Sequence, residues 1–143
     1  MNFPVKETSF SIRGRRGIGV VPPMDANTQD TSILVGSEDI SKLDLYPEDD
    51  PRALSLNGAF NVGNRGIVEF VEVFKNEIEF LHTMITATQE KAVPSPGKGA
   101  MIYFDGVILA HCNEAEWNKF KSENTNEAIL DRIVRVNVPY CLE

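Results

Sequence analysis

The chain lacks the long apolar runs that are typical of membrane-spanning helices and of secretory signal peptides. No stretch of its 143 residues approaches the roughly 20 consecutive apolar residues that a membrane-spanning helix needs. Residues 1–6 contain no basic segment followed by an apolar block, which argues against a secretory signal. The sequence therefore predicts a cytoplasmic protein without a membrane partner.

Cysteine is scarce, since Cys112 and Cys141 are the two thiols of the chain. Two cysteines far apart in sequence make no disulfide framework and have no zinc-ligand spacing. We expect both to be reduced and to behave as small, buried apolar groups. The sequence predicts no metal-ligating residues.

Positive charge is in the minority, because the net charge of the chain is −7. An acidic chain is a poor binder of the nucleic-acid backbone, so we expect no nucleic-acid partner. Arg13, Arg15 and Arg16 form the one local basic patch that could still act on phosphates.

Two glycine-rich stretches lack the spacing of nucleotide-binding loops. Gly14, Gly17 and Gly19 do not match a dinucleotide fingerprint, and prolines follow where its helix should begin. Lys98 follows a glycine, but the phosphate loop G-x-x-x-x-G-K-[ST] must lie between a strand and a helix. Here a predicted strand follows the lysine, so the chain contains no such loop.

The chain does contain alternating strand and helix patterns. Residues 66–75 are dense in β-branched and aromatic side chains, which predicts a strand buried on both faces of a parallel sheet. Other strands are predicted at 9–13 (an edge strand), 17–21, 100–104, 107–112 (a second buried strand) and 133–138. Helices are predicted at 31–36, 59–62, 76–90, from 113 onward, and at 125–132. This order predicts an α/β fold with a parallel sheet and flanking helices, and with residues 37–58 as an irregular, acidic loop.

Three asparagines stand three residues before a glutamate at the start of a helix pattern: Asn76, Asn113 and Asn124. This spacing is typical of a capping box, in which the two side chains satisfy free backbone N–H groups. The sequence therefore predicts that each asparagine begins a helix.

Three polar residues fall near the ends of the predicted elements, namely Glu72, Asn113 and Arg132. Ligands of open α/β sheets bind at the carboxyl ends of the strands. There an acid can orient water, an amide can sense a terminal phosphate, and an arginine can neutralise phosphate charge, typically on a neighbouring subunit. The three residues are candidate catalytic groups for nucleotide chemistry.

Each of the three also has a purely structural alternative. Glu72 could pair with Lys75 at the surface, and Asn113 could act only as a helix cap. Arg132 could bridge only to a neighbouring carboxylate such as Asp131. The second carboxylate of the strand, Glu69, is expected to be a structural partner of a nearby cation or amide.

The amino-acid sequences of several stretches, taken in order, resemble those of a known family. They are residues 17–19, 28–36, 58–75, 81–90, 108–114 and 127–133. Together they resemble the PrkA-type bacterial serine protein kinases, whose N-terminal portion is an AAA+ ATPase module. The likeness covers nearly the whole chain, and several motifs in the correct order make it specific.

The resemblance implies a role for each candidate residue. Glu72 is at the position of the Walker B glutamate that orients the attacking water, and Val71 is where many AAA+ proteins have the magnesium-binding aspartate. Asn113 matches sensor 1 and Arg132 the arginine finger, so both would bind ATP. Residues 37–58 would be an insertion that moves with nucleotide state.

The resemblance also implies a fold and a function. The fold would be an incomplete AAA+, P-loop NTPase-like parallel sheet that lacks the Walker A strand and loop. The chain would be an internal piece of a homo-oligomeric serine protein kinase, inactive alone, with ATP and Mg²⁺ as cofactors and a protein substrate. The missing strand would lie beside residues 133–138 and leave exposed sheet edges. The alternatives are a non-catalytic AAA+ interaction module, and a fragment of an AAA+ transcription activator or remodeller.

We expect the isolated 143-residue chain not to bind ATP usefully, because it has no phosphate-binding loop. Calorimetric titration with Mg-ATP checks this expectation. Micromolar binding would contradict it.

Overall fold

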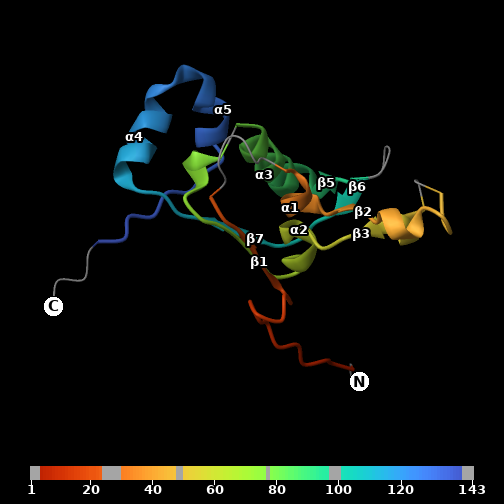
Figure 1. Cartoon of the computed structure of the whole chain (residues 1–143). Coiled ribbons are helices and arrows are strands. Elements are labelled where there is room, and N and C mark those ends of the chain that lie inside the picture. Colours follow the sequence, from red (N-terminus) through yellow and green to blue (C-terminus); the bar gives the residue numbers. More distant parts are fainter. Residues whose placement is uncertain (1–3, 24–29, 48–49, 77, 97–100, 140–143) are drawn as a thin grey trace.

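The computed structural model describes residues 4–23, 30–47, 50–76, 78–96 and 101–139 (Figure 1). All structural statements below concern this part of the chain. Its strands are β1 Ile18–Val21, β2 Ser37–Glu38, β3 Leu54–Ser55, β4 Ile67–Phe70, β5 Ala92–Pro94, β6 Met101–Tyr103 and β7 Val107–Ala110. Its α-helices are α1 Ser32–Val35, α2 Ala59–Val62, α3 Ile78–Glu90, α4 Glu114–Ser122 and α5 Glu127–Leu130, and its 3-10 turns are η1 Ile40–Lys42, η2 Pro51–Ala53, η3 Val73–Lys75 and η4 Asn124–Asn126.

A three-stranded parallel sheet in the order β1-β4-β7 forms the centre of the fold. Val68 of β4 stands opposite Gly19 on one side and Ile108 on the other. Because all three strands run in the same direction, their carboxyl ends lie together at one end of the sheet. We call this end the carboxyl edge. The predicted α/β class with a parallel sheet is confirmed.

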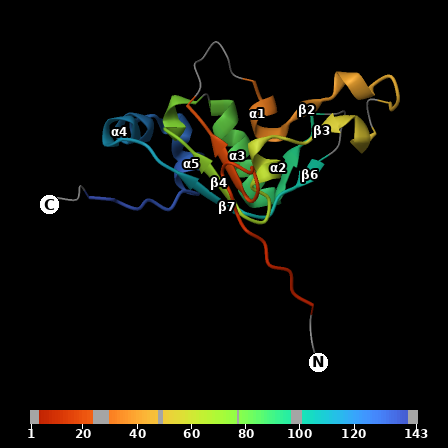
Figure 2. The ribbon, with the colours of Figure 1, turned by 60° about the horizontal axis from the view of Figure 1, so that its bottom comes forward.

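The sheet buries one face rather than two. Val21, Val68 and Phe70 are fully buried, whereas Ile67 and Glu69 on the alternate face are half-buried. In Figure 2 the strands lie in front of α3, which packs behind them. The prediction that residues 66–75 form a strand buried on both faces is therefore wrong, and β4 is also shorter, because the chain turns after Phe70.

Three phenylalanine rings attach the helical layer to the buried face. Phe60 of α2 lies 6.1 Å from Phe70 and 5.0 Å from Phe104, centroid to centroid. All three are fully buried, and such aromatic pairs contribute about 0.5–1.5 kcal/mol each beyond their area burial. Gly19 lets α2 approach this closely, because a Cβ there would lie 2.1 Å from the Ala59 carbonyl oxygen.

β7 forms an edge of the sheet, and its side chains are largely exposed. Val107 and Leu109 are 57% and 53% exposed, so the prediction of a second buried strand at 107–112 is wrong. The predicted strand at 133–138 is also absent: these residues have no strand structure, and Val134, Val136 and Val138 are exposed. An alternating pattern forms a strand only where a neighbouring strand offers its hydrogen bonds. Within the described residues, none pairs with the free edge of β7.

The turn before β4 is fastened to the turn before β7. The Asn64 side chain donates to the Tyr103 carbonyl oxygen at 3.0 Å and accepts from the Asp105 backbone N–H at 2.9 Å. The Arg65 N–H also donates to the Asp105 carbonyl oxygen. These bonds help to set the register of β4 against β7.

The described residues of the segment 37–58 are more ordered than predicted. They contain the β2–β3 pair and the turns η1 and η2, and they extend away from the sheet as an arm. Near its tip the Arg52 guanidinium lies over the Tyr46 ring at 4.3 Å and pairs with Asp50 at 2.6 Å. This ion pair lowers the pKa of Asp50 to about 2, chiefly through the side-chain hydrogen bond from Arg52.

The helix predictions are confirmed in position for α1, α2, α3 and α4, whereas α5 is shorter than the predicted 125–132. Asn124 does not cap α5, because the residue before that helix is Asn126, and the Asn126 side chain accepts no cap hydrogen bond. Asn76 is buried, and its Oδ1 has no hydrogen-bond partner among the described residues, so it does not cap α3. The Glu79 side chain lies outside the described part.

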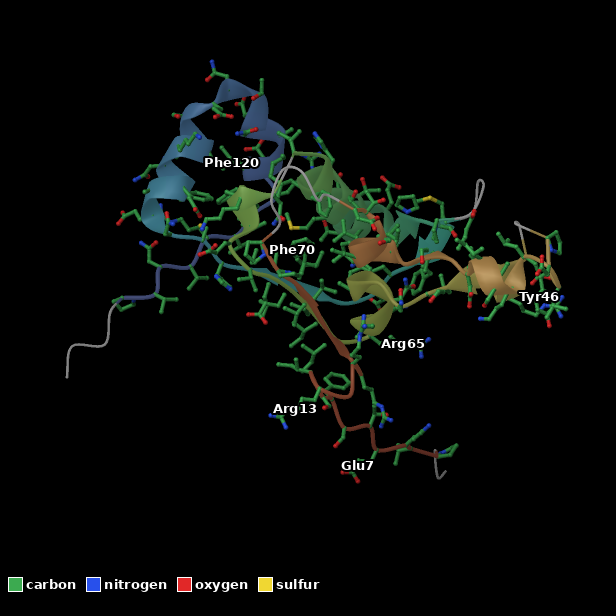
Figure 3. The ribbon with its side chains drawn as sticks, viewed as in Figure 1. Glu7, Arg13, Tyr46, Arg65, Phe70 and Phe120 are labelled. Carbon is green, nitrogen blue, oxygen red and sulfur yellow. The ribbon has the colours of Figure 1, made fainter. Side chains whose placement is uncertain are left out.

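The described terminal segments, residues 4–10 and 133–139, extend away from the body in different directions (Figures 1 and 2). The predicted edge strand at 9–13 is reduced to a single antiparallel bridge between Ser11 and Arg16. Figure 3 shows Arg13 on this segment, with Glu7 farther from the sheet. No helix in the described part is long and apolar enough to cross a membrane.

Candidate functional site

Glu72 lies where the chain turns out of the central strand. The Val71 N–H still donates to Val21 at 2.9 Å, and the Val73 N–H donates to the His111 carbonyl oxygen at 3.0 Å. Between them Glu72 adopts the left-handed conformation, with φ 49° and ψ 55°. Such a backbone costs of order 1–3 kcal/mol for a residue other than glycine and occurs often at functional sites.

The Glu72 carboxylate pairs with an ammonium group. Its Oε2 accepts a hydrogen bond from Lys75 Nζ at 2.6 Å, and the Glu72 side chain is 38% exposed. The hydrogen bond from Lys75 to Glu72 raises the pKa of the Lys75 ammonium group. Since exposed pairs contribute about 0–1 kcal/mol, this contact leaves the carboxylate free to exchange partners. The surface pairing considered from the sequence is thus present, without excluding a chemical role.

Asn113 follows β7 and begins α4. Its Oδ1 accepts a hydrogen bond from the Glu116 backbone N–H at 2.8 Å, which confirms it as the helix cap. Glu114 and Glu116 place negative charge in the first turn of α4, where it interacts favourably with the positive end of the helix dipole. The predicted capping role of Asn113 is therefore confirmed.

The segments that carry Glu72 and Asn113 are neighbours at the carboxyl edge of the sheet. Lys75 Nζ, paired with Glu72, is also 3.8 Å from Glu116 Oε1, and the Glu116 backbone in turn binds the Asn113 side chain. The hydrogen bond from Val73 to His111 joins the same two chain segments. The structure therefore brings together an acid and an amide that are 41 positions apart in the chain.

Arg132 is exposed and lies just after α5 in the chain. Its Nη1 donates to the Ala128 carbonyl oxygen one turn earlier. The contacts through Lys75 and Glu116 that join Glu72 to Asn113 do not include Arg132.

Glu69 has a different environment from Glu72. Its side chain is 40% exposed on the open face of the sheet, and its Oε1 lies 3.8 Å from His111 Nε2. This contact agrees with the expected structural role of Glu69 beside a cation or amide. Among the described residues there is no group of three His, Cys, Asp or Glu that could hold a metal ion.

Three residues of this region were missed by the sequence reasoning: Lys75 and Glu116 as the link between the two candidate residues, and His111 beside Glu69. His111 carried a usable signal, because it lies near the carboxyl end of the strand predicted at 107–112. The Lys75–Glu116 contact carried none, because it spans elements that sequence periodicity does not place together.

Cys112 is exposed, so the prediction of a buried thiol is wrong. The end of β7 has no covering neighbour in the described part, which leaves the side chain at the surface. Partial desolvation, followed by the nearby Glu116 carboxylate, raises the pKa of the thiol. Cys141 lies outside the described residues.

With this geometry established, comparison with known proteins assigns the family. A family model described as the PrkA AAA domain matches residues 1–143. The chain belongs to this family. The resemblance noted in the sequence is therefore confirmed.

Two relatives of this PrkA AAA domain chain carry different names. It is 47% identical over 140 residues to the serine/threonine kinase YeaG of Escherichia coli K12, a match that covers 98% of this chain and 22% of the relative. It is 41% identical over 140 residues to the ATP-dependent protease PrkA of Bacillus subtilis 168, covering 97% and 22%. The chain thus spans 22% of the length of both relatives.

Solved structures share the fold. NtrX from Brucella abortus in complex with ADP superposes with a TM-score of 0.55 at 16% identity, covering 88% of this chain and 25% of NtrX. Its complex with ATP gives 0.57 at 15% identity, covering 87% and 26%. At this identity the likeness concerns the fold alone, and it supports the partial P-loop NTPase-like architecture.

The cap at Asn113 can be tested separately from any chemistry. Asn113→Ala should lower the free energy of unfolding by about 1 kcal/mol, because it leaves a helix N–H without its acceptor. Asn118→Ala, the same substitution within α4, is the matched control and should stabilise slightly, because alanine is the better helix former. Chemical denaturation followed by circular dichroism measures both. Equal destabilisation by the two changes would contradict the capping role.

Proposed function

We propose that this chain is part of an ATP-hydrolysing AAA+ module in which Glu72 activates water and Asn113 senses the terminal phosphate. The observation that carries this proposal is the placement of Glu72 and Asn113 on neighbouring segments at the carboxyl edge of a parallel sheet. This edge is where α/β folds bind ligands, and the chain belongs to an AAA family. The strained backbone of Glu72 supports the proposal.

The described residues fit the chemistry of a phosphate group. When bound, ATP would supply a phosphoryl group for transfer. The Glu72 carboxylate would accept a proton from an attacking water after exchanging its Lys75 partner for that water. The Asn113 amide has its Oδ1 held by the helix cap, so its Nδ2 is the group that would donate to a phosphate oxygen. Arg132 would neutralise phosphate charge across a subunit interface.

Magnesium fits this part of the chain less well. Val71, at the position of the expected ligand, offers no side-chain oxygen, and Glu69 stands beside His111 on the open face. Mg²⁺ takes carboxylate oxygens together with substrate phosphates. We therefore assign no metal-binding role to a residue of this chain and derive no step through the ion.

The role of Glu72 is tested by Glu72→Gln in the intact protein. The amide cannot take a proton from water, so ATP turnover should fall about 100-fold or more, while equilibrium ATP binding stays unchanged. Glu69→Gln is the matched control, because it makes the same change to the other carboxylate of this segment, which lies within β4 on the open face of the sheet. Phosphate release and nucleotide titration give the two readouts. A similar loss of turnover in both variants would refute the assignment.

The role of Arg132 is tested by Arg132→Ala in the intact protein. Loss of an arginine finger should cut ATP turnover about 1,000-fold and leave nucleotide binding largely intact. Because the arginine is proposed to act on a neighbouring subunit, mixing Arg132→Ala with Glu72→Gln protein should restore part of the turnover. Equal loss of binding and turnover, with no recovery on mixing, would instead indicate a structural arginine.

We further propose that the module serves a cytoplasmic, homo-oligomeric serine protein kinase that phosphorylates protein serine or threonine. The relative named serine/threonine kinase YeaG supports this activity. The relative named ATP-dependent protease PrkA favours a second candidate, ATP-dependent proteolysis. Incubating the intact protein with γ-labelled ATP and casein separates them, since a kinase labels serine or threonine and a protease releases fragments.

A further inference from the structure

The sheet order β1-β4-β7 leaves one edge of β1 without a neighbouring strand in the described structure. The carbonyl oxygens of Gly17 and Val21 accept hydrogen bonds from the β4 side. Because the backbone groups of a strand alternate in direction, the N–H and C=O groups of Ile18 and Val20 face the free edge. Among the described residues these groups have no protein partner. They are available to pair with another strand.

A groove of about 440 Å³ lies along this free edge. Its lining includes residues 18–20 of β1 and no residue of β4, which places it on the side of β1 away from β4. Ile33 of α1 and Ala59 and Val62 of α2 give it apolar walls. An extended peptide that adds a strand to such an edge bonds to it through the main chain and places side chains in the adjoining groove.

Three exposed arginines lie on the turn that leads into β1: Arg13, Arg15 and Arg16 (Figure 3 labels Arg13). Arg15 also lines the groove, as the one charged residue in its described lining, and its side chain donates to the Asn57 carbonyl oxygen. Within the described part of the chain, no carboxylate forms an ion pair with any of the three. This end of the groove therefore favours a partner with negative charge, although the chain as a whole is acidic.

We propose that the free edge of β1 binds an extended, acidic peptide segment of another protein as an added strand of the sheet. Main-chain hydrogen bonds to Ile18 and Val20 would hold the segment, and an apolar side chain would enter the groove. A carboxylate near the turn would pair with the exposed guanidinium groups. This surface is separate from the proposed nucleotide chemistry, because Glu72, Asn113 and Arg132 do not line the groove.

The test is calorimetric titration of the intact protein with the peptide Ac-Asp-Val-Thr-Val-Asp-amide. A carboxylate at each end allows one to reach the arginines whichever way the added strand runs. Ac-Asn-Val-Thr-Val-Asn-amide, which has the same shape without the charge, is the matched ligand control. The acidic probe should bind saturably and about fivefold more tightly than the neutral one, since exposed ion pairs contribute modestly. Equal binding of the two probes, or no binding of the acidic one, would overturn the proposal.

Two N-methylated forms of the acidic probe test the strand pairing. Methyl groups on both valines remove one alternating set of N–H groups, and a methyl group on the threonine interrupts the other set. Because one set faces β1 and the other faces away, one form should lose at least tenfold in affinity and the other should lose much less. Equal binding of both forms would show that the peptide does not bind as a strand.

A pair of variants tests the charge at the turn. Arg15→Gln should weaken binding of the acidic probe about fivefold and leave binding of the neutral probe unchanged. Arg65→Gln is the matched control, because Arg65 is also exposed and left-handed, with φ 59° against 47° for Arg15, but lies outside the groove lining. It should leave binding of both probes unchanged. Equal weakening by the two substitutions would contradict the proposed contact.

Amide hydrogen exchange locates the binding on the edge. The N–H groups of Ile18 and Val20 should exchange quickly in the free protein and slowly when the probe saturates it. Those of Gly19 and Val21, which face β4, should be protected in both states. Protection of Ile18 and Val20 without probe would show that residues 4–10 or a second copy already cover the edge. That result, or unchanged exchange on saturation, would overturn the proposal.

Discussion

The parallel pairing of β4 with β1 and β7 is the interaction on which the rest of this structure depends. The three strands end at Val21, Phe70 and Ala110, and the pairing places these residues together at the carboxyl edge. The segments that follow β4 and β7 carry Glu72 and Asn113. The phenylalanine cluster on the buried face attaches α2 to the same sheet. The positions of both candidate residues therefore follow from strand register rather than from contacts between the residues themselves.

The two carboxylates of the central segment are separated by a change in backbone conformation. Glu69 is within the strand, where the period of two turns its side chain to the open face. Glu72 comes after the strand has ended, and its left-handed backbone turns the chain into η3. A regular strand through both positions would have placed them on opposite faces. The turn is what brings Glu72 and Lys75 beside the start of α4.

Local patterns were sufficient for much of the fold. The residues of β4, the position of α3 and the cap at Asn113 all follow from periodicity and spacing within a few positions. The failures at 107–112 and 133–138 have another cause, because an apolar pattern does not say whether a partner covers it. Likewise, sequence order placed Glu72 and Asn113 at strand ends, but it could not reveal the Lys75–Glu116 contact. The sequence also could not predict the backbone conformation of Glu72, because glutamate rarely adopts the left-handed conformation. The chemical roles of Glu72, Asn113 and Arg132 remain predictions.

The parallel sheet also determines when this chain can fold during synthesis. Each strand pairs with one that lies about 40 to 50 residues away along the chain, and closing loops of that length carries an entropic cost before any pairing is gained. β1 leaves the ribosome well before β4, and β4 before β7. Until residue 110 has emerged, β7 is not available to pair with β4, and the three-stranded sheet is incomplete. A chaperone bound during that interval would lower the chance of aggregation.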